Sequence, residues 1–481
     1  MSTTEESLPG QAAEAATWHK TLTWWDGFVL MLPLASGVFV SSGFMVGALG
    51  AWGAFLVMMV MCVVALLSNF LFGEMAAMFP EKTGGLSMYT REAMRRYFIP
   101  AGVLAAFGYW LGYAISISFC ALQVGQLIQV QWFPKVTWSV TMIGGTHLGL
   151  ANFIGFALVI VAAILAWLGV KIMARAAFWL GILAVAVVLI AMIGPWVTGQ
   201  AHTSNLTMHL GNWRGVVVWM YIAGWTLFGS ELGAAFAPEY KDAKRDVPRV
   251  LLLSAIYGMI IFTITPVSVC AMYGEKFTAM NALTLGPMAA AKVVGGGQWL
   301  FTIIYAAAIS VSVLIFTQDS ARATAGMAED GDTIKQFRNL NRFGVPHWGV
   351  LLVGLSNLAF LAFVANPVAI ILASNLGYIL CHSLANWSFV VLRVTQPDRP
   401  RPIKMGPAWM PIAVLLGCFH LFILTVGILS PGAAGYGGLK DTLIGIGFLC
   451  FGLVLWVIRV VVQEHQPLRL REPVAAVAVA S

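Results

Sequence analysis

The chain has 481 residues, of which 59% are hydrophobic and only 10% are charged, and its mean hydropathy is +0.85. This composition excludes an ordinary soluble protein and is typical of a protein with many membrane-spanning helices. The formal net charge of +7 does not indicate a nucleic-acid partner, because the basic residues alternate with apolar stretches in the way that orients membrane helices.

Residues 1–26 are expected to form a flexible cytoplasmic tail. They are rich in Ala and contain Glu5, Glu6 and Glu14. A cleaved signal would instead have a basic start followed by an apolar run.

Twelve mostly apolar stretches follow, each near the ~20 residues that a helix needs to cross the hydrocarbon core. They cover residues 27–46, 51–79, 101–130, 149–168, 176–197, 215–237, 250–273, 299–320, 347–364, 366–392, 407–429 and 441–462. With both termini in the cytoplasm, most Lys and Arg fall on the inner side, as the positive-inside rule requires. We predict an all-α, multi-pass protein of the cell membrane with one membrane domain, 27–462, and a cytoplasmic tail, 463–481.

The first and sixth stretches are interrupted by residues that break helices, chiefly Pro33, Ser36 and Gly37 in one and Gly224, Gly229 and Gly233 in the other. In lipid, an interrupted helix is stable only where its unpaired backbone N–H and C=O groups face protein, a cavity or a ligand. Small residues also allow close helix packing, which is the plainer interpretation of either break alone. Two breaks in matching positions favour a binding site in the middle of the membrane.

Each interrupted stretch opens a set of five. Because five is odd, the second set (about 215–392) must enter the membrane from the side opposite to the first (about 27–197). This predicts a 5+5 inverted repeat with discontinuous helices 1 and 6, and the helices of about 407–462 stand outside it.

The half-helix after a break presents free N–H groups to a carboxylate, and the half before it presents carbonyls to an ammonium group. Gly37 and Gly229 let a ligand approach the backbone, and Ser36 adds a hydroxyl. Carbonyls near Ala223–Phe228 suit an amine. A zwitterion or an amine is therefore the expected ligand.

Glu231 lies beside the second break. Placing an ionisable side chain at this depth in the membrane costs at least ~2.5 kcal/mol, so such a residue is expected to have a function or a bonding partner. It is a proton carrier, a partner of a cationic ligand, or a neutral acid bonded to loose backbone. Trp225 and Phe228 lie one helical turn apart. Their rings either cover the bound ligand or pack against neighbouring helices. Gln123 and Asn375 reach mid-membrane depth, where they bind the ligand or bond to a neighbouring helix.

Seven further positions are candidates for a gate, for coupling or for an ion site. Glu74 is expected to stabilise the inner end by accepting bonds from the 82–96 loop, and Asp319 and Arg322 share a helix face at the inner mouth. His382 and His420 either relay protons or satisfy helix contacts. Ser312 and Thr317 are weak candidates for a sodium site.

The chain lacks the residue clusters of an enzyme. No HExxH or GxSxG pattern occurs, so we expect no catalytic residues, metal or cofactor. All six cysteines fall in predicted spans and none in an outer loop, which indicates no disulfide-linked heavy chain. The basic segments 241–249 and 393–404 are interpreted as topology determinants and lipid-headgroup contacts.

Several motifs resemble those of the amino acid–polyamine–organocation (APC) permeases across nearly the whole chain. PLASGVF is similar to GSGIF, and FGEMAAMFPEKTGG with LSMYTREA is similar to AELGAMxPxxGGxYxYxREA. FGSELGAAFAPEYKDAKRDVPR resembles FxGFExxxxxxEExKNPxRxIPR. DSARATAGMAEDG and NRFGVPHWG resemble SRxxYAxARDG and NxxGxPxxA.

The resemblance implies a LeuT-type fold and a secondary transporter that moves an amino acid, polyamine or related amine by alternating access. Ser36, Gly37 and Val38 match the piece that binds the substrate carboxylate. The run WTLFGSE, with Trp225, Phe228, Gly229 and Glu231, is close to WSFxGxE of arginine/agmatine antiporters, where the Trp stacks on substrate and the Glu senses pH. A lysine used by some members in the fifth span is replaced here by about Ala184.

The sequence leaves three questions open: which amino acid or amine is carried, whether transport is exchange or symport with a proton or sodium, and whether the protein is a monomer or a homodimer. An amine-gated channel or a non-transporting nutrient receptor on the same fold is the alternative function.

Overall fold

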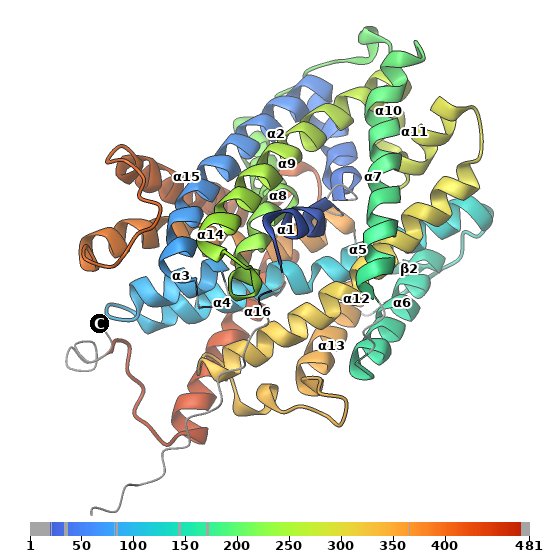
Figure 1. The fold of residues 1–481 in the computed structure, drawn as a ribbon. Coiled ribbons are helices and arrows are strands. Elements are labelled where there is room, and N and C mark those ends of the chain that lie inside the picture. The colour runs from blue at the N-terminus through green and yellow to red at the C-terminus, as the bar shows by residue number, and fades with distance from the viewer. Residues whose placement is uncertain are drawn as a thin grey trace, which may run out of the picture.

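The structure is a computed structural model that describes residues 20, 22–32, 37–80, 82, 85–142, 146–169, 173–364 and 366–472. These residues form a bundle of long, tilted helices that cross one another (Figure 1). Among them are nine helices long and apolar enough to cross a membrane, and two shorter apolar helices. The predicted helical membrane class is therefore confirmed, while the count of twelve crossings and the inverted repeat stay predictions.

The predicted stretches all coincide with helices. In chain order the α-helices are α1 (Trp24–Met31), α2 (Val38–Met78), α3 (Gly85–Met94), α4 (Ile99–Ala114), α5 (Ser116–Trp132), α6 (Leu150–Trp167), α7 (Met173–Val197), α8 (Trp213–Leu227), α9 (Ala243–Tyr273), α10 (Glu275–Met280), α11 (Leu285–Val294), α12 (Gln298–Glu329), α13 (His347–Phe363), α14 (Pro367–Thr395), α15 (Trp409–Leu429) and α16 (Leu439–Val457). The 3₁₀ segments are η2 (Thr203–Asn205), η3 (Phe228–Glu239), η4 (Lys335–Arg338) and η5 (Pro431–Ala434), and η6 (Ile458–Gln463) is a π-helical end.

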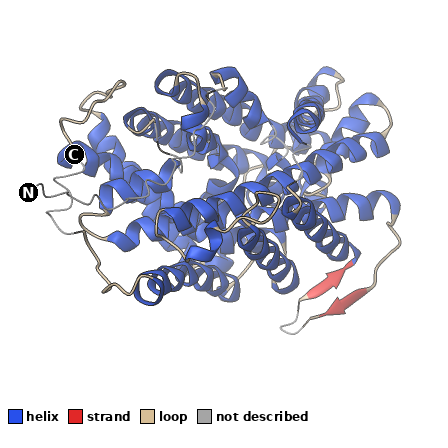
Figure 2. Cartoon of the chain, turned by 60° about the horizontal axis from the view of Figure 1, so that its bottom comes forward, coloured by secondary structure: helices blue, strands red, loops and turns tan. Residues whose placement is uncertain are grey.

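Helices α3, α10 and α11 occupy segments that were expected to be loops. A second difference is the antiparallel hairpin of β1 (Ser139–Thr141) and β2 (His147–Gly149), which projects from the edge of the bundle in Figure 2. These elements are short and lie outside the apolar stretches, so the pattern that reveals membrane helices does not detect them.

A turn at Gly50 divides α2 into the second half of the first predicted span and the whole of the second. Gly50 has a φ of 72°, and a Cβ there would lie 2.6 Å from the carbonyl oxygen of Thr207. Only glycine fits this backbone and this contact. Trp52 N–H donates to Thr207 O at 2.9 Å, and His209 N–H donates to Leu49 O at 2.7 Å, so the groups freed by the turn are bonded.

The third predicted span, 101–130, is divided at Ile115 into α4 and α5. Asn357 of α13 bonds both sides of the division. Its Nδ2 donates to Ala114 O at 2.9 Å, and its Oδ1 accepts from Ser118 N–H at 2.8 Å. This discontinuity was not predicted, because the asparagine that stabilises it lies far away in sequence.

Helix α14 occupies the centre of the bundle, and 89% of its most apolar stretch is buried. It crosses α4 at two glycines: a Cβ on Gly108 would lie 2.4 Å from Gly377 O. Asn366 caps the helix by accepting from Ala369 N–H at 2.8 Å. The close crossing brings side chains of α4 and α14 together beside the sixth span.

Candidate functional site

In the first span predicted to be interrupted, α1 ends at Met31 and α2 begins at Val38. Ser36 and Pro33 lie outside the described residues. Gly37 precedes α2 as its N-cap, and apart from its neighbours in the chain no atom of the described residues lies within 4 Å of where its Cβ would be. The backbone at Gly37 therefore borders open space, while the side chain of the next residue, Val38, is buried.

One carbonyl at the end of α1 already has a partner. Tyr257 of α9 donates its hydroxyl to Leu32 O at 3.0 Å. An ammonium group at this end would therefore share or replace the tyrosine's hydrogen bond.

The sixth span changes its geometry at the predicted break. It is α-helical to Leu227 and continues from Phe228 as the 3₁₀ segment η3. A 3₁₀ stretch inside a longer helix has poorer hydrogen-bond geometry and often marks a hinge. Gly229 is buried in the first turn of η3; the backbone of Phe228 is described but its side chain is not.

The first turns of α2 contact the end of α8, just before the sixth span changes its geometry. The hydroxyls of Ser41 in α2 and Thr226 in α8 lie 2.7 Å apart, and both side chains are buried. On the other side of the breaks, Leu22 N–H donates to Glu239 O at 3.0 Å, and Lys241 N–H donates to Leu22 O at 2.8 Å. These bonds join the segment before α1 to the end of η3.

Trp225 lies one turn before the geometry changes and faces the division between α4 and α5. Its Nε1–H is within 3.1 Å of both Gly112 O and Ser116 Oγ, and its ring lies 5.7 Å from that of Phe119. The ring is only partly buried. The indole is thus fixed at its polar edge, and part of the side chain is exposed.

Asn375 of α14 bonds the backbone of α8 two residues before Ala223. Asn375 Nδ2 donates to Tyr221 O, and Tyr221 returns a hydrogen bond from its hydroxyl to Leu372 O at 2.8 Å. Asn375 Oδ1 has no partner among the described residues. Ala223 is fully buried next to this pair.

Gln123 is held by a different part of the chain. Its Nε2 donates to Leu283 O at 3.3 Å, just before α11. This bond joins α5 to the turn before α11, and a role of Gln123 in binding the ligand stays a prediction.

Glu231 is buried, with 1% of its surface exposed, and two tyrosines from different helices donate hydrogen bonds to it. Tyr113 of α4 donates to Oε1 at 2.8 Å, and Tyr378 of α14 also donates to Oε1. Tyr109 packs against both tyrosine rings, with centroids 4.9 and 5.8 Å away. Phenols from two different helices thus bind the carboxyl group of Glu231.

His382 brings a basic nitrogen toward the same carboxyl group. Its Nε2 lies 4.0 Å from Glu231 Oε1, and its Nδ1 lies 3.1 Å from Tyr378 O. A carbonyl only accepts, so Nδ1 carries a hydrogen and a neutral ring presents an unprotonated Nε2 to Glu231. The pair therefore suits one proton: an acid beside a neutral imidazole, or a carboxylate beside an imidazolium.

A second buried histidine continues this arrangement toward α15. The rings of His382 and His420 stack with centroids 5.8 Å apart, and His420 Nδ1 lies 2.7 Å from Leu416 O. Both rings are at most 1% exposed. Glu231, His382 and His420 form a line of ionisable groups through three elements.

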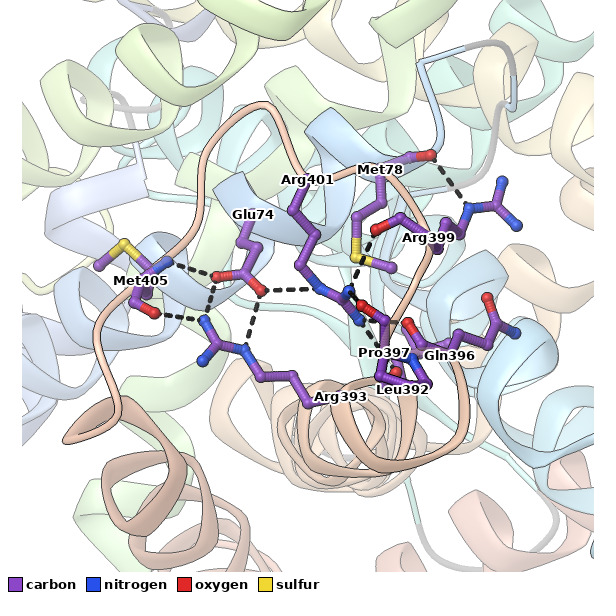
Figure 3. Close-up of polar contacts among 9 residues, drawn as sticks. All are labelled: Glu74, Met78, Leu392, Arg393, Gln396, Pro397, Arg399, Arg401 and Met405. Carbon is purple, nitrogen blue, oxygen red and sulfur yellow. Dashed lines mark hydrogen bonds and ion pairs between the residues drawn. The ribbon is translucent and has the colours of Figure 1, made fainter.

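Glu74 has partners other than the expected ones. Its carboxyl group accepts from Arg393 Nε at 2.9 Å and Nη2 at 2.5 Å and from Met405 N–H at 2.7 Å, and Arg401 Nε lies 3.4 Å away (Figure 3). The 82–96 loop was the wrong partner, because Lys82 pairs with Glu92 at 2.5 Å inside that segment. Glu74 instead joins α2 to the end of α14 and the loop after it.

Asp319 and Arg322 form the expected pair on one face of α12, at 3.7 Å, but the side chains are 42% and 69% exposed. Such a pair contributes little by itself. Burial raises the pKa of Glu239, at the end of η3, and Arg322 lowers it. The charge of Arg322 thus acts on the end of η3.

Ser312 and Thr317 direct their hydroxyls into their own helix. Ser312 donates to Ala308 O at 3.1 Å and Thr317 donates to Val313 O at 2.7 Å. These are the ordinary i−4 bonds of helical Ser and Thr.

The structure thus brings Trp225, Gly229 and Glu231 together on one span and places the start of α2 against it. Tyr113, Tyr378, Ser41 and Thr226 were not predicted. Tyrosines in a membrane sequence are expected at interfaces, and the glycines at Gly108 and Gly377 were the available signal that α4 and α14 approach closely.

Known proteins point to the same class. The chain matches the model of a family described as amino acid permease over residues 22–456. It is similar to the lysine-specific permease LysP of Escherichia coli (strain K12), at 22% identity over 93% of each chain. It is also similar to the amino-acid permease RocE of Bacillus subtilis (strain 168), at 24% identity over 66% of this chain and 68% of that one, and to the histidine permease HisP of Lactococcus lactis subsp. cremoris (strain MG1363), at 26% over 69% of each.

The family match covers most of the chain and agrees with the APC resemblance of its motifs and with its apolar helices. The protein belongs to the amino acid permease family and is a multi-pass membrane transporter of amino acids.

Proposed function

We propose that the chain moves its amino acid by alternating access through twelve spans arranged as a LeuT-type 5+5 inverted repeat. The observation that carries the proposal is the meeting of two interrupted spans, where Ser41 contacts Thr226 at 2.7 Å. Both termini lie in the cytoplasm. Repeat one covers about 27–197, repeat two about 215–392, and α15 and α16 stand outside them.

The substrate lies between the breaks. Its carboxylate is bound by N–H groups at the start of α2, after Ser36 and at Gly37 and Val38, where the positive end of the helix dipole points. Its ammonium group is bound by carbonyls near Ala223–Phe228. Open space beside Gly37 and the partial exposure of the Trp225 side chain support this placement.

The substrate is an amino acid whose side chain extends toward Trp225, Gly229 and Asn375. Asn375 Oδ1 is buried and has no partner among the described residues, so it is available to a donor on the substrate. Gln123 supports the outer side through Leu283. The names of the relatives include lysine and histidine, and the screen described below decides among side chains.

Glu231 and His382 form the proton site that couples to transport. One proton shared by this pair neutralises the carboxyl group in the membrane, where an uncompensated charge is costly. Movement of η3 relative to α4 and α14 changes the distance to Tyr113, Tyr378 and His382, and so changes how strongly the proton is held. Sodium at Ser312 and Thr317 is not needed in this scheme.

The inner gate is formed where α1 and η3 are joined through Leu22. Because these backbone bonds join the two segments, they open and close as one unit against α12 at Asp319 and Arg322. Glu74 and its arginines stay with the surrounding helices and support the loop after α14.

Counterflow in proteoliposomes tests this function. A thermal-shift screen of the amino acids and of polyamines first identifies the ligand of the purified protein. Vesicles loaded with unlabelled ligand are then expected to accumulate labelled ligand transiently. Equilibration without accumulation would instead indicate a channel, and binding without uptake would indicate a receptor.

A further inference from the structure

A groove lies between α2, α9 and the loop that precedes α15. Its volume is about 640 Å³, within the usual range for small-molecule sites. Apolar side chains from all three elements form its walls, and they include Leu66, Phe70, Leu252 and Ile403.

One end of the groove is basic. Lys244, Arg245 and Arg249 line it, all three are exposed, and none has a side-chain partner among the described residues. Asp242 is the one acidic residue among the lining residues, so three positive charges face one negative charge at this end. An anion is the complementary ligand.

The other end of the groove leads to a surface suited to hydrocarbon. One helical turn from Leu66 lies Val63, and one turn from Leu252 lies Ile256, and each of these two side chains is 41% exposed. Both helices thus carry exposed apolar residues from the groove toward the middle of the membrane. The site combines a basic end with an apolar end in the orientation of a membrane lipid.

We propose that this groove binds an anionic phospholipid, with its phosphate at Lys244, Arg245 and Arg249 and an acyl chain between α2 and α9. In the proposed orientation the lipid belongs to the cytoplasmic leaflet, whose negative surface attracts such basic segments. The proposal does not depend on which substrate is carried.

A bound lipid would contact elements that hold the transporter together. Met405 lines the groove, and its backbone N–H donates a hydrogen bond to the Glu74 carboxyl group. Asn69, also in the groove, donates to Ser230 in η3 at 2.9 Å and to Leu251 O in α9 at 3.0 Å. The lipid therefore stabilises the folded protein at the junction of α2, α9 and the sixth span.

The test compares phosphatidylglycerol with phosphatidylcholine added to the full-length protein in neutral detergent. Phosphatidylglycerol is expected to raise the unfolding temperature by at least about 2 °C more than phosphatidylcholine. The variant Lys244→Gln/Arg245→Gln/Arg249→Gln is expected to lose this difference. These residues are exposed, so their replacement does not disturb the core.

Two controls separate a built site from general attraction of charge. Arg96→Gln/Arg338→Gln/Arg342→Gln removes three charges outside the groove and is expected to keep the difference. Gly73→Leu keeps every charge but occupies the groove, where its Cβ meets Pro248 only at an ordinary 3.4 Å, and is expected to lose it. The proposal is overturned if Gly73→Leu keeps the full shift, if both triple variants lose it equally, if the two lipids act alike, or if glycerol phosphate alone reproduces the shift.

Discussion

The buried network around Glu74 gives the sharpest prediction on stability. Glu74 is fully buried and faces Arg393 and Arg401, whose side chains are only 13% and 4% exposed. Arg401 also donates to four carbonyls of the chain from Leu392 to Arg399. Glu74→Ala would leave two guanidinium groups without their counter-charge and Met405 N–H without an acceptor.

Breaking a buried ion pair by removing one partner costs about 3–5 kcal/mol. The average entropy of unfolding, about 2.1 cal/mol/K per residue, corresponds to roughly 1 kcal/mol/K for 481 residues that unfold together. We therefore expect Glu74→Ala to lower the unfolding temperature by about 3–5 °C. Differential scanning fluorimetry of the purified protein in detergent measures this shift.

A double-mutant cycle with Arg393→Ala isolates the interaction. The double variant is expected to lose less than the sum of the single losses, by about 1–3 kcal/mol. Asp319→Ala is the control, because its pair with Arg322 is exposed and its loss costs at most about 1 kcal/mol. Additive losses, or an equal effect of Asp319→Ala, would refute the reasoning.

Three further predictions concern the binding site, the proton site and a group outside the spans. Trp225→Ala is expected to weaken the apparent substrate affinity about 2- to 30-fold, from the 0.5–2 kcal/mol of an aromatic–cation contact, with Trp225→Phe intermediate; isothermal binding measures this. Glu231→Gln is expected to keep exchange of bound substrate but to make net uptake independent of pH, and a pH profile like that of the natural protein would contradict the proton site. Burial raises the pKa of Asp332 to about 6, opposed by Arg91 and assisted by Asp330, so the native state loses stability as pH rises from about 4 to 6. Asp332→Asn should therefore gain stability over the natural protein across this range in thermal scans, and a constant difference would count against the burial.

The positions of the helices followed from the sequence because lipid imposes a length and an apolar composition on each crossing. The break in the sixth span followed as well, since Gly224, Gly229 and Gly233 are visible in the chain. Its form did not: the helix tightens to 3₁₀ geometry from Phe228 instead of ending.

Contacts between distant segments were the part that the sequence alone did not predict. The division of the third span depends on Asn357, and the environment of Glu231 depends on Tyr113 and Tyr378. Each of these residues has an ordinary alternative use in a membrane helix, so only the packing of α4, α13 and α14 assigns its role. Glu74 likewise pairs with Arg393 and not with the expected 82–96 loop, because Arg393 is distant in sequence and only the packing brings it close.

The central claim is that the open backbone at the first break binds the substrate. The most direct measurement is equilibrium binding of the amino acid identified in the thermal-shift screen to Gly37→Leu, with Gly326→Leu as control. At both glycines an added Cβ would meet no other segment of the described chain within 4 Å. Both variants are expected to fold, and Gly37→Leu is expected to lose binding while Gly326→Leu keeps it. Unchanged affinity in a folded Gly37→Leu variant would contradict the proposed site.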